Sequence, residues 1–231
     1  MKLVIANKVY SSWSLRPWLL MKQFGIPFEE VLVPFGPTFD DPEWKRAVAA
    51  YTPAGKVPAL IDGEVRVWDT LAIMEYLAEK RPDLAIWPTD AAARAMARSI
   101  SAEMHSGFGG LRGACPMNLG RRYAGRDRGP GVDADVGRIT AVWREARKRF
   151  GGKGEGPFLF GSFCAADAMY APVATRLDTY GFALEADARA YVDAILASEG
   201  YRAWLAEALA EPWIVPEDEV DEPALVDLRK P

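Results

Sequence analysis

Three serines stand close together just after the first apolar stretch of the chain, in the order Ser11-Ser12-Trp13-Ser14. Pro17 follows, and proline is tolerated only in the first turn of a helix, where its missing N–H is not needed. We therefore expect a helix to begin at about Ser14, with Ser14 as its N-cap. Ser11 and Ser12 would then lie in the loop before the helix, with their hydroxyls free to act on a ligand.

Serine hydroxyls beside a helix N-terminus suit the activation of a thiol. Lowering a thiol pKa from about 8.5 to about 6.5 requires roughly 2.7 kcal/mol. One hydrogen bond to a charged acceptor supplies about 1.5–3 kcal/mol, and the helix end supplies about 0.3–1 kcal/mol. The simpler interpretation is that the serines only form the turn and cap the helix, so the remaining residues of the site must decide.

Two further segments would hold a peptide beside the serines. Lys56-Val57-Pro58 precedes an apolar strand, and a cis bond before Pro58 would leave the Val57 N–H and C=O free to pair with an extended peptide. A trans proline that merely begins the strand is the alternative. Asp69-Thr70 precedes a helix, where Asp69 can accept from an ammonium and Thr70 can donate to a carboxylate, in addition to capping.

The elements that must position these residues alternate in type along the first eighty positions. Strands are predicted at 2–6, 29–33, 59–61 and 64–68, and helices at 14–24, 43–50 and 70–80. This β-α-β-α-β-β-α order is that of a thioredoxin-like α/β module, which we assign to residues 1–81. A connector punctuated by Pro82 and Pro88 follows.

Alanine-rich helical patterns replace the strand signals from residue 90 onward. Helices are predicted at 91–108, 133–150, 165–180, 187–198 and 201–210, with loops at 109–131 and 151–157. We therefore expect an all-α domain over 90–215. The acidic, proline-bearing residues 216–231 are expected to form an extended tail.

Composition excludes several classes of function. The 231 residues carry a formal net charge of -4, which argues against nucleic acid or an anionic membrane as the main partner. The chain begins with a short strand pattern rather than a signal peptide, and no apolar run approaches the roughly 20 residues of a membrane span. Cys115 and Cys164 have no metal-like or redox spacing, and His105 is the single histidine. A cytoplasmic protein without a metal is expected.

The serine cluster, Val57-Pro58 and Asp69-Thr70 together resemble the glutathione site of the cytosolic glutathione S-transferase family, and the serines are most similar to zeta-like bacterial members. The resemblance implies glutathione as co-substrate. It implies contacts from Ser11, Ser12, Trp13, Lys56, Val57, Pro58, Asp69 and Thr70. The thiol would be activated by Ser11, or else by Ser12 through its hydroxyl or backbone N–H.

The resemblance extends into the helical half. Cys164 with Asp167 three residues later is similar to the family's buried helix start, although Cys164 stands where Ser or Thr is usual, so Asp167 is expected to cap the helix. His105 and Arg112 are the candidates for binding the second substrate. Each has an ordinary alternative, as a helix-end histidine and a solvated arginine. Arg112 together with Arg16 could bind an anionic substrate.

The expected function is that of a glutathione transferase, in which the glutathione thiolate attacks an electrophilic small molecule. One alternative is a glutathione-dependent cis-trans isomerase of the maleylacetoacetate type, although Trp13 stands where those enzymes carry cysteine. Another is a non-catalytic adaptor or regulator of the same fold, against which the retained ligand residues argue. The resemblance also implies a homodimer.

Overall fold

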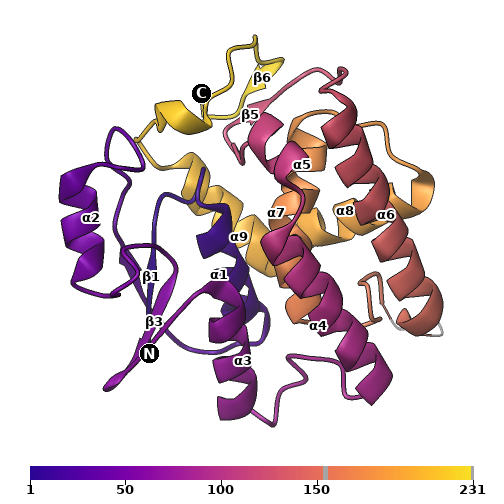
Figure 1. Cartoon of the computed structure of the whole chain (residues 1–231), viewed down its shortest axis with the longest axis horizontal. Helices are drawn as coiled ribbons and strands as arrows, with labels where there is room; N and C mark the ends of the chain where they lie inside the picture. Colours follow the sequence, from indigo (N-terminus) through magenta and orange to yellow (C-terminus); the bar gives the residue numbers. More distant parts are fainter. Residues whose placement is uncertain (153–155, 230–231) are drawn as a thin grey trace.

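A four-stranded sheet organises the first part of the computed structural model, which describes residues 1–152 and 156–229 (Figure 1). The strands are β1 (Lys2–Ile5), β2 (Glu29–Leu32), β3 (Ala59–Asp62) and β4 (Val65–Trp68). They lie in the order β2-β1-β3-β4, with β1 and β2 parallel and the other pairs antiparallel. The order of elements confirms the predicted thioredoxin-like module.

The sheet separates two layers of side chains because successive residues of a strand point to opposite faces. Leu3 and Ile5 of β1 belong to the large core that also contains residues of α1 (Ser12–Gln23) and α3 (Thr70–Lys80). Val4 points the other way and packs in a smaller cluster with α2 (Pro42–Ala49). The sheet is therefore covered on both faces.

The second part of the chain is helical, as predicted. Its helices are α4 (Ala91–Ser106), α5 (Gly109–Ala114), α6 (Pro130–Phe150), α7 (Ala165–Thr179), α8 (Ala186–Ala197) and α9 (Glu199–Leu209). Helix α7 is almost entirely buried and packs against α4, α8 and α1. One continuous apolar core thus joins the two parts. No helix in the described ranges has both the length and the apolar character needed to cross a membrane.

Helix α1 begins earlier than the sequence predicts. It starts at Ser12 rather than Ser14, and Pro17 lies inside it. A proline here leaves the carbonyl of Trp13, four residues earlier, without its helical donor. The Thr70 hydroxyl donates to that carbonyl at 3.3 Å, so a residue of another helix supplies part of the missing interaction. The Ser14 side chain, predicted as the N-cap, does not cap this helix.

The loop predicted at 109–131 contains α5 and a short strand, β5 (Arg121–Arg122), and α6 begins within it at Pro130. Proline favours such a first-turn position because no helical partner is needed for its nitrogen. Residues 153–155 of the predicted loop 151–157 lie outside the described residues.

The predicted extended tail is folded in its described part, residues 216–229. It contains a 3-10 helix, η1 (Pro216–Asp218), and a strand, β6 (Val226–Asp227), which pairs antiparallel with β5. Its acidic side chains face arginines of the helical domain. Glu222 is nearly buried and forms an ion pair with Arg128 at 2.6 Å. The expectation of an extended tail was wrong because its charges have partners in the fold.

Asp167 is fully buried at the start of α7, where it caps the helix. Its carboxylate accepts from the backbone N–H groups of Cys164 at 2.9 Å and Leu159 at 3.1 Å, and from the Tyr191 hydroxyl at 3.0 Å. Burial raises the pKa of this carboxyl to about 6, against the effect of these hydrogen bonds. The structure therefore agrees with the predicted structural role.

We expect Asp167→Ala to lower the free energy of unfolding by about 2–4 kcal/mol, because several buried donors lose their acceptor. Urea denaturation at neutral pH would measure this. Asp133→Ala, at an exposed position in the first turn of α6, is the control and should change stability by less than about 0.5 kcal/mol. Equal effects of the two substitutions would contradict the capping role.

Candidate active site

The serines lie on a tight turn between β1 and α1. The backbone N–H of Ser11 donates to the Asn7 carbonyl at 2.8 Å, and that of Ser12 donates to the Tyr10 carbonyl at 2.9 Å. The Ser12 N–H is therefore already engaged inside the turn. A ligand thiol could be held by this N–H only if it shared the N–H with the Tyr10 carbonyl or displaced it.

The two candidate hydroxyls have different surroundings. The Ser11 hydroxyl donates to the Ser14 Oγ at 2.7 Å, and Ser14 also accepts from the Ala6 N–H at 3.2 Å. The Ser12 hydroxyl has no hydrogen bond within the described part of the chain. Ser11 is 5% exposed and Ser12 9% exposed, and both line the same cavity. Either hydroxyl can therefore contact a ligand in the cavity from a position that is almost inaccessible to solvent.

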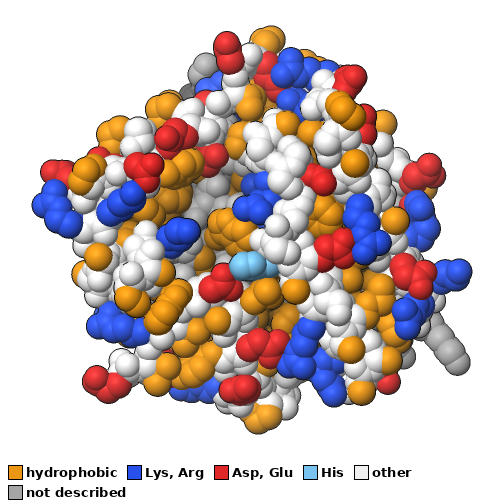
Figure 2. Space-filling view, in the orientation of Figure 1, with side chains coloured by type: hydrophobic (Ala, Val, Ile, Leu, Met, Phe, Trp, Pro, Cys, Tyr) orange, Lys and Arg blue, Asp and Glu red, His pale blue; other side chains and the backbone are white. Residues whose placement is uncertain are grey.

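This cavity has a volume of about 800 Å³ and lies between the two parts of the chain. Figure 2 shows the face where the molecule is hollowed, with basic side chains gathered around the hollow. Aromatic rings form much of its wall, contributed by Tyr10, Trp13, Phe35, Phe39 and Trp44. Charged side chains also line it, namely Asp40, Lys45, Lys56, Arg112, Arg176 and Asp218.

A second, smaller cavity of about 300 Å³ adjoins the first. The two share wall residues, which are Trp13, Ala54, Lys56, Val57 and Arg112. Asp69, Thr70 and His105 line the smaller cavity and do not line the larger one. The structure thus places the serines in one compartment and Asp69-Thr70 in the next, with Val57 between them.

The Val57-Pro58 bond is cis, which confirms the prediction. Strand β3 begins after it, at Ala59. Neither the N–H nor the C=O of Val57 forms a hydrogen bond in the part of the chain that the structure describes. These two backbone groups are available to an extended peptide that runs between the compartments.

Asp69 is held in place by both domains. It has a positive φ of 73°, and its Oδ1 accepts from the Leu71 N–H at 2.9 Å. Its Oδ2 lies 2.6 Å from Nε2 of His105, a residue of α4. His105, predicted as a candidate for binding the second substrate, thus lies beside the predicted peptide anchor and does not line the larger cavity. Sequence separation conceals this pairing, because the partners are 36 positions apart.

Two arginines contact the ring of Trp13, and they differ in their burial and in whether they line the cavities. The Arg16 guanidinium lies 4.0 Å from the centre of the Trp13 ring, and that of Arg112 lies 5.0 Å from it. Arg16 is buried, and it donates to the carbonyls of Ser12 and Met169, both at 2.9 Å. Burial lowers the pKa of Arg16. The predicted partnership of Arg16 with Arg112 on an anion was wrong, because Arg16 is buried and lines neither cavity, whereas Arg112 lines both.

Sequence reasoning missed several residues of the larger cavity, among them the charged Arg176 of α7 and Asp218 of η1. Burial lowers the pKa of Arg176 to about 10, and its Nε donates to the Cys115 carbonyl at 2.8 Å. Burial raises the pKa of Asp218 to about 7, although the nearby Arg176 opposes this shift. A single arginine inside a helical pattern and one acid within an acidic run carry no distinguishing sequence signal.

Comparisons with known proteins agree with this geometry. Residues 10–80 match the family model described as "Glutathione S-transferase, N-terminal domain". Over 98 residues, 42% of each chain, the protein is 36% identical to the "Probable maleylacetoacetate isomerase" of Caenorhabditis elegans. Over 165 residues it is 29% identical to "Glutathione S-transferase T1" of Arabidopsis thaliana, covering 67% of this chain and 65% of that protein. The chain therefore spans less than two thirds of either relative.

Solved structures match over most of the chain. A glutathione transferase homologue from Burkholderia, crystallised with bound glutathione, aligns with a TM-score of 0.68 and 21% identity, covering 90% of this chain and 97% of that one. A bacterial maleyl pyruvate isomerase described as zeta class aligns with a TM-score of 0.63 and 23% identity, covering 92% and 99%. Residues 10–80 are thus similar to the glutathione S-transferase N-terminal domain, and the whole chain has the fold of the glutathione transferase structures.

We expect Asp218→Asn to stabilise the protein at pH 8 by about 1 kcal/mol, or about 2–4 °C in Tm. A carboxyl whose pKa is raised in the folded state binds a proton more tightly there, so stability is lost as the pH rises from about 4, where the unfolded chain ionises, through about 7, and the amide does not lose it. The difference in Tm should shrink toward pH 5. Asp221→Asn, at an exposed position, is the control and should show no such trend. A gap that widens toward pH 5 would contradict the assignment.

Proposed function

We propose that this protein is a glutathione transferase that binds glutathione across both cavities and activates its thiol for attack on a small electrophile. The supporting observation is the linear arrangement of groups along the two compartments. Val57 offers free backbone groups between the Asp69 side and the serine side. An extended tripeptide would place its γ-glutamyl end at Asp69 and its cysteinyl sulfur at the serines.

The γ-glutamyl end would use the groups around the start of α3. The Asp69 carboxylate, fixed by His105, can accept from the α-ammonium group, and the first N–H groups of the helix can face the α-carboxylate. The Thr70 hydroxyl already donates to the Trp13 carbonyl. We therefore expect the backbone N–H of Thr70, rather than its hydroxyl, to donate to the α-carboxylate of glutathione. Lys56, which lines both cavities, adds positive charge along the peptide.

Ser11 can serve the thiolate by a short relay of hydroxyls. Hydroxyl protons rotate to suit their partners. When a thiolate arrives, Ser14 can donate to Ser11 and Ser11 to the sulfur, while Ser14 continues to accept from the Ala6 N–H. The positive end of α1 adds to the stabilisation of the charge. The unpartnered hydroxyl of Ser12 is the alternative donor, so the two serines must be compared directly.

The electrophile would occupy the remainder of the larger cavity. Its aromatic walls and the guanidinium groups of Arg112 and Arg176 favour a planar molecule that carries an anionic group. The sulfur would form a bond to an electrophilic carbon while the leaving group departs with its electron pair, and the thiol proton would pass to water. The nearly buried positions of Ser11 and Ser12 would limit the contact of the thiolate with bulk solvent.

Isomerisation of an unsaturated acid is the second candidate. It is favoured by the pair of arginines in the cavity and by the names of two relatives, a probable maleylacetoacetate isomerase and a maleyl pyruvate isomerase. Trp13 at the cysteine position of the zeta-like serine motif weighs against it. A non-catalytic adaptor would bind glutathione without turning over any electrophile. Retention on immobilised glutathione followed by assays with conjugation and isomerisation substrates separates the three functions.

We expect Ser11→Ala to raise the pKa of bound glutathione by about one to two units, because the lost hydrogen bond to a charged acceptor is worth about 1.5–3 kcal/mol. The rate at neutral pH should fall, while the affinity for glutathione changes little. Ultraviolet absorbance of the bound thiolate against pH measures the shift. Ser12→Ala is the matched variant, and a shift confined to Ser12→Ala would transfer the role to Ser12.

We also propose a cytoplasmic homodimer. The small-residue start of α4 is partly exposed, and Trp68 on the edge strand β4 is 45% exposed. We expect Ala95→Arg on this face to shift sedimentation toward the monomer at micromolar concentration, because a buried unpaired charge opposes association. Ala190→Arg, exposed on α8, is the control and should sediment like the wild type. A monomeric wild type would refute the proposal.

A further inference from the structure

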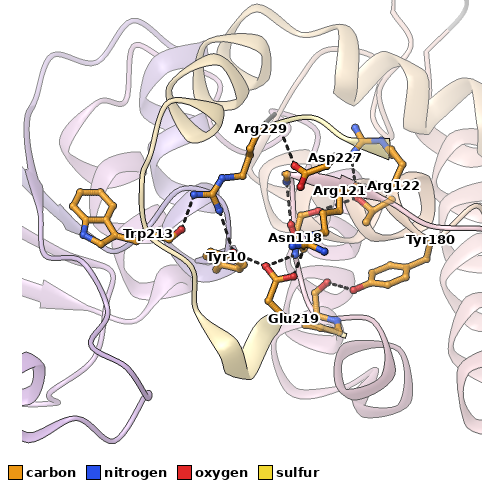
Figure 3. A network of polar contacts seen from close by, with 12 residues as sticks. Tyr10, Asn118, Arg121, Arg122, Tyr180, Trp213, Glu219, Asp227 and Arg229 are labelled. Atoms are coloured by element: carbon orange, nitrogen blue, oxygen red, sulfur yellow. Dashed lines mark hydrogen bonds and ion pairs between the residues drawn. The ribbon is translucent and has the colours of Figure 1, made fainter. Parts of the chain in front are cut away.

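The C-terminal segment, residues 211–229, reaches back from the helical domain to the turn that carries the serines (Figure 3). Glu219 is at the centre of this contact. Its Oε1 accepts from the Tyr10 hydroxyl at 2.6 Å and from Nδ2 of Asn118 at 3.1 Å, and its Oε2 lies 3.2 Å from Nε of Arg121. Asn118 and Arg121 of the helical domain thus orient the carboxylate that accepts from Tyr10.

Arg229 closes the segment on itself. Its Nη2 donates to the carbonyls of Glu211 at 2.6 Å and Trp213 at 2.7 Å, so the two ends of the segment are joined. Its Nη1 donates to the Tyr10 hydroxyl at 3.2 Å, and the Leu228 N–H donates to the Gly120 carbonyl at 2.7 Å. The segment is therefore fixed at both ends around Tyr10.

Tyr10 directly precedes Ser11 and is 3% exposed. Its carbonyl accepts from the Ser12 N–H, and its own N–H donates to the Asn7 carbonyl, so its backbone is part of the serine turn. Burial and the contact with Glu219 raise the pKa of the Tyr10 hydroxyl, which keeps it a neutral donor. A residue with its main chain in the turn and its hydroxyl on Glu219 transmits the position of the segment to the serines.

The same segment reaches the cavity of the proposed electrophile. The Glu217 carboxylate accepts from the Phe39 N–H at 2.5 Å, on the side of the thioredoxin-like domain. The next residue, Asp218, lines the cavity, as does Phe39. The segment therefore contacts both domains on either side of the cavity, and Glu219 is its connection to the serine turn.

We propose that Glu219 is a positioning residue for thiol activation. It acts through Tyr10 to hold the Ser11-Ser12 turn in place, while the segment that carries it forms one wall of the electrophile cavity. The effect on thiol activation depends on the proposed function, whereas the effect on the turn does not.

The test compares Glu219→Ala, Glu219→Gln and Tyr10→Phe in the full chain with Asp221→Asn as the control at an exposed position. The first readout needs no ligand: hydrogen exchange of the backbone amides of residues 7–15. We expect about tenfold faster exchange in Glu219→Ala and Tyr10→Phe, because each loses the contact that braces the turn. Glu219→Gln keeps an acceptor for the Tyr10 hydroxyl and should lie closer to the wild type.

The second readout is the chemistry at the thiol. In Glu219→Ala and Tyr10→Phe we expect a higher pKa of bound glutathione and a kcat at neutral pH lower by about tenfold. The KM for glutathione should change less than about twofold, because the contacts at Val57 and Asp69 lie outside the altered network. Tyr10→Phe retains the buried ring, so it tests the hydrogen bond even where Glu219→Ala perturbs folding.

The outcomes are distinct. Wild-type exchange in both Glu219→Ala and Tyr10→Phe would overturn the inference. So would a lower Tm in these variants with unchanged thiol pKa and kcat, because that result describes a purely structural brace. A wild-type protein that neither binds glutathione nor turns over an electrophile would refute the proposed function, while the exchange data would still decide whether Glu219 holds the turn.

Discussion

The turn that carries the serines depends on hydrogen bonds from distant parts of the chain. A buried loop cannot leave its backbone groups unpaired without a large cost. The Glu211 carboxylate accepts from the N–H groups of Lys8 at 2.8 Å and Val9 at 3.3 Å, and the Trp204 indole donates to the Lys8 carbonyl at 2.9 Å. The Arg16 guanidinium donates to the Ser12 carbonyl. The helical part of the chain therefore supplies several of the hydrogen bonds that hold this turn in place.

Lys8 shows how strongly the domains are coupled at this point. Its side chain is only 5% exposed, and its ammonium pairs with Glu30 of the thioredoxin-like domain and with Glu207 of α9. It also lies 5.6 Å from the ring of Trp204. Burial alone would lower the pKa of this amine, but hydrogen bonds to the two carboxylates outweigh it and the pKa is raised. A buried charge paired on both sides makes separation of the domains costly.

The same docking divides the candidate site into two compartments with different chemistry. The smaller one pairs Asp69 with His105, one residue from each domain, around a polar pocket. The larger one combines aromatic side chains with the guanidinium of Arg176. Trp13 lies in the wall of both and contacts the edge of the His105 ring at 5.2 Å between ring centres. The smaller polar compartment and the larger aromatic one thus share one wall.

Local patterns in the sequence predict much of this molecule. The apolar run at residues 3–6, helical spacing from Thr70 onward and the position of Pro58 together lead to the thioredoxin-like module and to its peptide-binding edge. Asp167 is recognisable as a helix cap because capping requires a fixed distance along the chain. These features depend on neighbours within a few residues, which is why the sequence alone can reveal them.

Tertiary structure decided the remainder. Helix α1 begins at Ser12, and Thr70, far along the chain, donates to the Trp13 carbonyl that Pro17 leaves without its helical partner. The packing of the two domains places His105 against Asp69. The same packing brings the acidic C-terminal residues across the serine turn, where Glu219 contacts Tyr10. The sequence by itself determined the module and the types of residue at its ligand-binding edge. Packing determined which side chains from the helical half meet that edge, because contacts between distant residues leave no periodic signal.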